Sequence, residues 1–136
     1  MTAEAGAPSA ASVKDLVSIT LPAQGAYLSV LRTATAGLAA RLDFTIDEIE
    51  DLRIAVDEAC AMLLTQAIAG ADLTAEFGIE PASLSASVSV LTSDGREPSR
   101  DTFAWTVLTA LAGEVETSSD VDKRVRITLT KRRGAA

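Results

Sequence analysis

The side chains best suited to chemistry are the acidic pair Asp57-Glu58, which interrupts the apolar run LRIAVDEACAMLL over residues 52–64. On a helical wheel of about 100° per residue, Glu58 falls roughly opposite the apolar core face and beside Ile54 and Met62. A fully solvated helix face would be richer in Lys and Glu. This half-apolar face therefore indicates that a loop, a ligand or a partner covers it. The alternative interpretation is that Glu58 is an ordinary exposed carboxylate.

Other chemistries are limited by the residues that the chain lacks. It contains no histidine, which excludes imidazole as a catalyst or a metal ligand. It contains one cysteine, which excludes an internal disulfide and a cysteine zinc cluster. Because Cys60 falls on the apolar face of the same helix, we interpret it as a small core residue.

The overall composition favours one packed domain that meets other proteins. The chain has 136 residues, of which 48% are hydrophobic, which is enough for a single core. Its net charge of −7 disfavours direct binding to nucleic acid, which needs a basic face, and suits a partner with a basic surface. The sequence shows no secretory signal and no apolar run of the roughly 20 residues needed to span a bilayer. We therefore expect a cytoplasmic protein with no membrane contact.

Hydrophobic periodicity predicts the elements that must position Glu58. Alternating apolar residues predict strands, and apolar residues spaced by three or four predict helices. The expected strands lie over 17–21, 73–79, 84–90, from 115, and over 125–129. The expected helices lie over 24–42, 45–69 and 102–112. Residues 1–11 are Ala-rich and without pattern, which predicts a flexible tail and leaves residues 12–133 as a single domain.

The helix that carries Glu58 has the clearest start. Thr45-Ile46-Asp47-Glu48 has the form of a capping box, in which the side chains of the first and fourth residues each bond a backbone amide of the first turn. The order of elements is β-α-α-β-β-α-β-β, in which successive strands form hairpins. This order predicts an α+β fold, a two-layer sandwich of a mostly antiparallel sheet covered on one face by three helices.

The run DLRIAVDEACAMLL (51–64) resembles the N-box helix of the GHKL, or Bergerat-fold, ATPases, in the version found in bacterial anti-sigma factor serine kinases. The resemblance extends over about residues 16–132, and includes FTIDEIEDLRIAVDEA and LTALAGEVET. It looks closest to the general-stress and sporulation anti-sigma factors of actinobacteria. It implies a fold of the histidine-kinase ATPase type with a reduced ATP lid.

The resemblance also implies a role for Glu58, which stands where the family has the general base that activates a target serine. One turn later the family has an asparagine that holds Mg²⁺ between the ATP phosphates, a pairing suited to phosphoryl transfer. Here that position is Met62, whose thioether has no useful affinity for Mg²⁺. Glu58 then resembles the remnant of a catalytic base, and no metal site is expected.

The nucleotide motifs implied by the resemblance are also incomplete. The family binds adenine with Asp-x-Gly-x-Gly, and this chain has only TSDGR over residues 92–96, which leaves Asp94 and Gly95 as the candidate cofactor-binding residues. A glycine-rich phosphate element is expected at the start of the third helix, where Phe103-Ala104-Trp105 stands instead. We expect both rings to fill the vacated pocket. No bound cofactor is therefore predicted, and ATP with Mg²⁺ would bind only if the nucleotide site still functions.

The partner surface is the part of the resemblance that survives. In the family an arginine on the first helix contacts the sigma factor and the competing anti-anti-sigma protein, and counting back from Glu58 places Arg32 there. Its planar fork suits two-point contacts with carboxylates. The alternative is a solvated arginine on an amphipathic helix. The resemblance further implies a homodimer that holds one sigma factor.

Three hypotheses of function follow from the sequence. The first is an anti-sigma factor that sequesters an alternative sigma factor and is antagonised by a STAS-type anti-anti-sigma protein, through competition for partners rather than through enzyme activity. The second is an active serine/threonine protein kinase that phosphorylates its antagonist with Mg-ATP and Glu58 as base. The third is a scaffold or small-ligand sensor on a GHKL fold that has lost its activity.

Overall fold

Five strands form one antiparallel sheet in this computed structural model, which describes residues 15–134. The sheet order is β1-β2-β3-β5-β4, and every neighbouring pair is antiparallel. The strands are β1 (Asp15–Pro22), β2 (Asp72–Glu80), β3 (Ser83–Leu91), β4 (Glu114–Ser119) and β5 (Arg124–Arg132). The predicted tail over residues 1–11 lies outside the described residues, as do residues 12–14.

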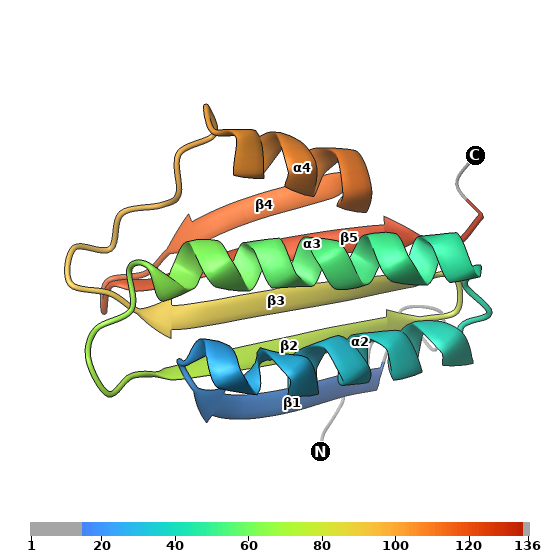
Figure 1. Cartoon of the computed structure of the whole chain (residues 1–136), viewed down its shortest axis with the longest axis horizontal. Helices are drawn as coiled ribbons and strands as arrows, with labels where there is room; N and C mark the ends of the chain where they lie inside the picture. The colour runs from blue at the N-terminus through green and yellow to red at the C-terminus, as the bar shows by residue number, and fades with distance from the viewer. Residues whose placement is uncertain (1–14, 135–136) are drawn as a thin grey trace, which may run out of the picture.

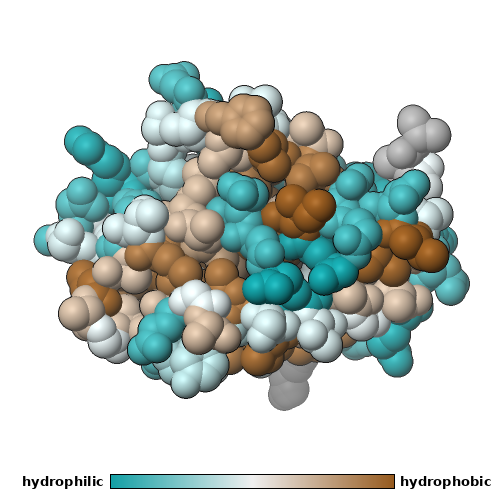
Figure 2. Space-filling model, viewed as in Figure 1, coloured by the Kyte–Doolittle hydropathy of each residue, from teal (hydrophilic) through white to brown (hydrophobic). Residues whose placement is uncertain are grey.

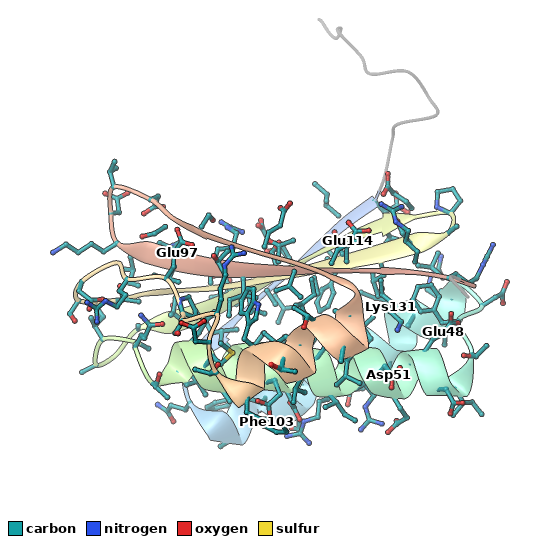
Figure 3. All side chains as sticks on the ribbon, turned by 90° about the horizontal axis from the view of Figure 1, so that it is seen from above. Glu48, Asp51, Glu97, Phe103, Glu114 and Lys131 are labelled. Atoms are coloured by element: carbon teal, nitrogen blue, oxygen red, sulfur yellow. The ribbon has the colours of Figure 1, made fainter. Side chains whose placement is uncertain are left out.

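Three α-helices cover one face of this sheet (Figures 1 and 3). They are α2 (Leu28–Arg41), which follows the 3₁₀ turn η2 (Gly25–Tyr27), then α3 (Ile46–Leu64) and α4 (Phe103–Ala112). The helix α3 lies in the middle and packs against α2, α4, β3 and β5. The predicted two-layer α+β sandwich with three helices on one face is therefore confirmed.

Alternation along the strands decides which face of the sheet is covered. On β2, for example, Leu73, Ala75 and Phe77 are buried toward the helices, whereas Thr74 and Glu76 point to the other face. A shift of one residue in register would turn every one of these side chains to the wrong face. The inward residues of β3 and β5 complete the core under α3: Leu84, Ala86, Val88, Val90, Val125, Ile127 and Leu129.

The start of α3 is fixed by the predicted capping box and by the end of the chain. The Thr45 amide donates to Glu48 Oε1 at 2.8 Å, and the Glu48 amide donates to Thr45 Oγ1 at 3.1 Å. The Gly134 amide donates to Glu48 Oε2 at 2.9 Å. The backbone N–H of Thr45, followed by that of Gly134, lowers the pKa of the Glu48 carboxyl below its usual value. One carboxylate thus joins the first turn of α3 to the segment after β5.

Glu48→Gln is expected to lower stability by about 0.3–1 kcal/mol at neutral pH, the usual size of a surface charge effect at a helix end. A folded-state pKa below the unfolded value means that the charge stabilises above the unfolded pKa. This contribution is lost as the pH falls through the folded pKa. Thermal unfolding at pH 7 and pH 3 measures the difference, with Glu116→Gln on exposed β4 as control. An equal loss at both pH values would contradict the prediction.

The predicted end of α3 near Ala69 is wrong, because the helix ends at Leu64. The Thr65 hydroxyl donates to the Met62 carbonyl at 2.7 Å, and Ala67 forms an isolated β-bridge with Thr92. The Ile68 amide donates to the Leu91 carbonyl at 3.1 Å. Backbone groups that would have continued the helix bond instead to the end of β3.

None of the helices within residues 15–134 is long and apolar enough to cross a lipid bilayer.

Candidate functional site

The core face of α3 packs on the sheet, and its flanks pack against α2 and α4, which leaves the outward face free for contacts. Leu52, Val56 and Leu63 are buried against the sheet, and Cys60 lies among them. Burial, followed by the nearby Asp57 charge, raises the pKa of the Cys60 thiol to about 12. The thiol therefore stays protonated and unreactive at neutral pH, as its predicted place in the core implies.

Glu58 is half-buried and lies seven positions after Asp51 on nearly the same side of α3, the side where Asp51 meets Lys131 near the end of α4. Its carboxylate has no hydrogen bond and no ion pair with any residue in the described range 15–134. One turn later Met62 forms part of a cavity wall. The expected base and the expected metal-ligand position therefore follow each other along one edge of α3.

The cavity lies between the end of α3, the segment after it, and the loop that leads into α4. Its volume is about 770 Å³, within the usual range for small-molecule sites. The wall brings Met62 together with Asp94, although 32 positions separate them in the sequence. The lining residues are Met62, Thr65, Gln66, Ala67, Ile68, Ala69, Ser93, Asp94, Arg96, Glu97, Pro98, Ser99, Thr102 and Ala104.

Polar groups in the cavity wall are largely engaged by the protein itself. Asp94 Oδ1 accepts from the Arg96 amide at 3.0 Å, and Gln66 Nε2 donates to the Arg96 carbonyl at 2.6 Å. Glu97 accepts a hydrogen bond from the Thr117 hydroxyl of β4. These bonds fix the loop that forms one wall of the cavity.

Gly95 stands beside the wall and gives the loop its turn. Its φ is +68°, and a Cβ there would lie 3.1 Å from Ser119 Oγ and 3.3 Å from Lys123 Cα. Its amide donates to Thr92 Oγ1 at 2.7 Å. A side chain here would be strained by the positive φ and by the lack of space. The turn therefore needs a glycine whether or not a ligand binds.

Arg32 lies on α2 at the surface and is held by α3. Its Nε is 3.0 Å from Asp57 Oδ1, with 39% of the arginine side chain and 38% of the aspartate side chain exposed. This is the one ion pair of Arg32 within residues 15–134. Sequence reasoning found Arg32 but missed its pairing with Asp57, although opposite charges at the facing edges of two adjacent helices were a usable signal.

Comparison with known proteins decides the family. No protein-family model matches the chain. The anti-sigma-F factor RsbW of Mycobacterium tuberculosis is 34% identical over 130 residues, which cover 88% of this chain and 75% of that protein. The chain belongs to the RsbW family.

Further comparisons support the fold and limit what carries over. The serine-protein kinase RsbW of Bacillus subtilis is 48% identical over 46 residues, which span 34% of this chain and 29% of that kinase. A crystal structure of the RsbU and RsbW domains of a Mycobacterium tuberculosis protein matches with a TM-score of 0.64 at 18% identity. That match covers 88% of this chain and 32% of the other, and confirms the GHKL-type fold.

The cavity of this RsbW family member does not fit Mg²⁺-ATP well. Mg²⁺ prefers oxygen ligands in octahedral geometry, whereas Met62 presents a thioether at the wall. No group of three or more Asp, Glu, Cys or His residues within 15–134 is arranged to hold a metal ion. Arg96 is the one basic side chain among the described lining residues, so a triphosphate would meet little positive charge.

The start of α4 also differs from what the sequence suggested for an RsbW nucleotide site. Trp105 is buried in the core at 8% exposure and is not among the residues that line the cavity, and the Arg100 guanidinium lies 4.9 Å from its ring centre. The prediction that Phe103 fills the pocket is wrong, because 82% of it is exposed and it points away from the sheet (Figure 3). Residues two positions apart in a helix are separated by about 200° around its axis. Burial of Trp105 therefore turns Phe103 outward.

Proposed function

We propose that this protein is an anti-sigma factor that sequesters an alternative sigma factor of a stress or developmental response. Membership of the RsbW family supports this role, since the relative that matches most of the chain is named an anti-sigma-F factor. A STAS-type anti-anti-sigma protein releases the sigma factor by binding in its place. The protein acts in the cytoplasm as a homodimer.

Competition between partners, rather than phosphorylation, sets the switch in this proposal. The observation that carries it is Met62 in the cavity wall, where a metal-holding amide would be needed for phosphoryl transfer. Glu58 remains as a carboxylate without that metal partner. The output then depends on the two affinities and the two partner concentrations.

Arg32 is the residue through which both partners compete. Asp57 bonds its Nε, which leaves the two terminal nitrogens of the guanidinium to grip a carboxylate in a two-point contact. The net charge of −7 steers a basic sigma factor toward the protein and speeds encounter.

A direct test titrates the wild-type protein with each alternative sigma factor of its source organism, in the absence of nucleotide. We expect one to bind, and a purified STAS-domain antagonist to displace it without ATP. Displacement that requires ATP would overturn the competition mechanism. Binding of no sigma factor at low and moderate salt would overturn the anti-sigma role itself.

A serine/threonine protein kinase is the second candidate. The names of the Bacillus relatives, which are serine-protein kinases, favour it, as does the unpaired Glu58 carboxylate beside a cavity of about 770 Å³. Transfer of labelled phosphate to the antagonist would establish it, provided that Glu58→Ala abolishes transfer and Glu50→Ala, on the same helix, does not.

A further inference from the structure

The outer surface of the helix layer exposes apolar side chains from α3 and α4. Ile54 on α3 is 46% exposed and Phe103 on α4 is 82% exposed. In Figure 2 brown side chains over α4 and the middle of α3 are bordered by teal ones. An exposed aromatic beside aliphatic groups with a polar rim is typical of a contact surface.

Two contacts show which parts of the three helices lie side by side. The Arg32–Asp57 ion pair aligns α2 with the middle of α3. Lys131 Nζ donates to the Leu111 carbonyl at 2.8 Å and lies 3.7 Å from Asp51 Oδ2, which aligns the end of α4 with the start of α3 (Figure 3).

Helix geometry then places Phe103 beside Glu58. The helices α3 and α4 run in opposite directions (Figure 1). Phe103 comes eight positions before Leu111, which is about 12 Å along the axis of α4. Because Leu111 lies level with Asp51, Phe103 lies level with the residue eight positions after Asp51 on α3, which is residue 59. Ile54 is one turn from Glu58 on the outward face, so one partner segment can contact all three.

The charges around these apolar groups are mainly negative. Five carboxylates of α3 lie at or beside its outward face: Asp47, Glu50, Asp51, Asp57 and Glu58. Three of them have cationic partners, Arg53, Lys131 and Arg32. The surface therefore keeps two net negative charges, and Asp47 and Glu58 have no ion pair within residues 15–134.

We propose that this surface, formed by Ile54, Phe103 and Glu58, binds an amphipathic helix of the sigma factor. The apolar face of that helix covers Ile54 and Phe103, and a Lys or Arg beside it pairs with Glu58. A carboxylate of the same partner takes the free edge of Arg32, which makes the surface continuous with the contact already assigned. The inference rests on the proposed function and names the partner segment.

Charge complementarity favours this occupant over two others. A second copy of the chain would bring the same acidic surface against itself, and like charges across an interface cost affinity. A nucleic acid would meet two net negative charges at the site. A helix with a basic edge removes the repulsion and buries the exposed aromatic ring, the type of residue that dominates protein interfaces.

The test compares surface variants in binding to the sigma factor that the wild type binds most tightly. Phe103→Ser and Ile54→Ser are each expected to weaken binding about tenfold, as for central interface residues. Val121→Ser removes an apolar side chain that is 97% exposed in the turn between β4 and β5, and should change affinity less than twofold. Glu58→Lys is expected to weaken binding at least as much as Phe103→Ser, whereas Glu116→Lys on β4 should not.

Each outcome decides the inference. Losses confined to Phe103, Ile54 and Glu58 variants, with unchanged thermal unfolding, support it. If all these variants bind the sigma factor as tightly as the wild type does, the inference is overturned and the anti-sigma role still stands. If the variants weaken only the binding of the STAS antagonist, or change only the oligomeric state, the surface belongs to another occupant. Either result also overturns the inference. A wild type that binds no sigma factor removes the proposed function itself.

Discussion

Replacing Arg32 with glutamate is expected to lower affinity for the sigma factor by roughly 30-fold or more, because losing one partner of an interface charge pair costs about 2–5 kcal/mol. The new carboxylate would face Asp57, which now lies 3.0 Å from Arg32 Nε. It would also repel the carboxylate of the partner. Calorimetric titration of the sigma factor into wild type and variant measures the change.

Two further variants test whether affinity depends on the guanidinium of Arg32 itself, on its charge alone, or on any positive charge along α2. Arg32→Lys keeps the charge but loses the planar fork, so affinity should fall by an intermediate factor. Arg41→Glu makes the same charge change at the end of α2, where Arg41 is exposed, and should have little effect. Equal losses for Arg41→Glu and Arg32→Glu would show general steering by charge and would contradict a specific contact.

Local patterns were sufficient to predict the layers of the fold. The alternation in β2 and β3 fixed their inward faces, and the Glu80–Ser83 connection formed the expected hairpin. The capping box at Thr45 predicted the first residue of α3. Each of these depends on residues within about ten positions of one another, where side-chain periodicity and backbone bonding act directly.

Contacts between distant residues account for what the sequence did not predict. Continuing α3 to Ala69 suits the local helix propensity, but Thr92 lies close enough to pair with Ala67, and tertiary bonding overrides propensity. The insertion of β5 between β3 and β4 likewise depends on which core faces meet. No window of the sequence contains that information.

The cavity also combines features that the sequence predicted with contacts between distant residues that it did not predict. Sequence motifs identified which side chains an RsbW-type nucleotide site would lack, at Met62 and at the start of α4. A cavity of about 770 Å³ lies beside Met62 and Asp94, and its lining comes from segments that are far apart in the sequence. The bond from Gln66 to the Arg96 carbonyl joins residues 30 positions apart and could not be expected from motifs.

ATP is expected to bind the wild-type protein weakly at most and with no dependence on Mg²⁺, and Met62→Asn should gain a Mg²⁺ dependence of about tenfold or more, the effect of restoring an important group at a metal site. An amide oxygen is a hard ligand that Mg²⁺ accepts, and a thioether is not. Calorimetry with Mg²⁺ and with a chelator measures the ratio of the two dissociation constants for each protein.

Met62→Leu is the matched control, because it conserves volume and apolar character in the partly buried position next to the core and adds no ligand. It should behave as the wild type does. Tight, Mg²⁺-dependent binding by the wild type would mean that other groups of the cavity hold the metal, and Glu58 would then have a phosphate to act beside. The absence of Mg²⁺ dependence leaves Glu58 with the role that its half-buried, unpaired carboxylate on α3 supports, which is contact with a basic partner side chain.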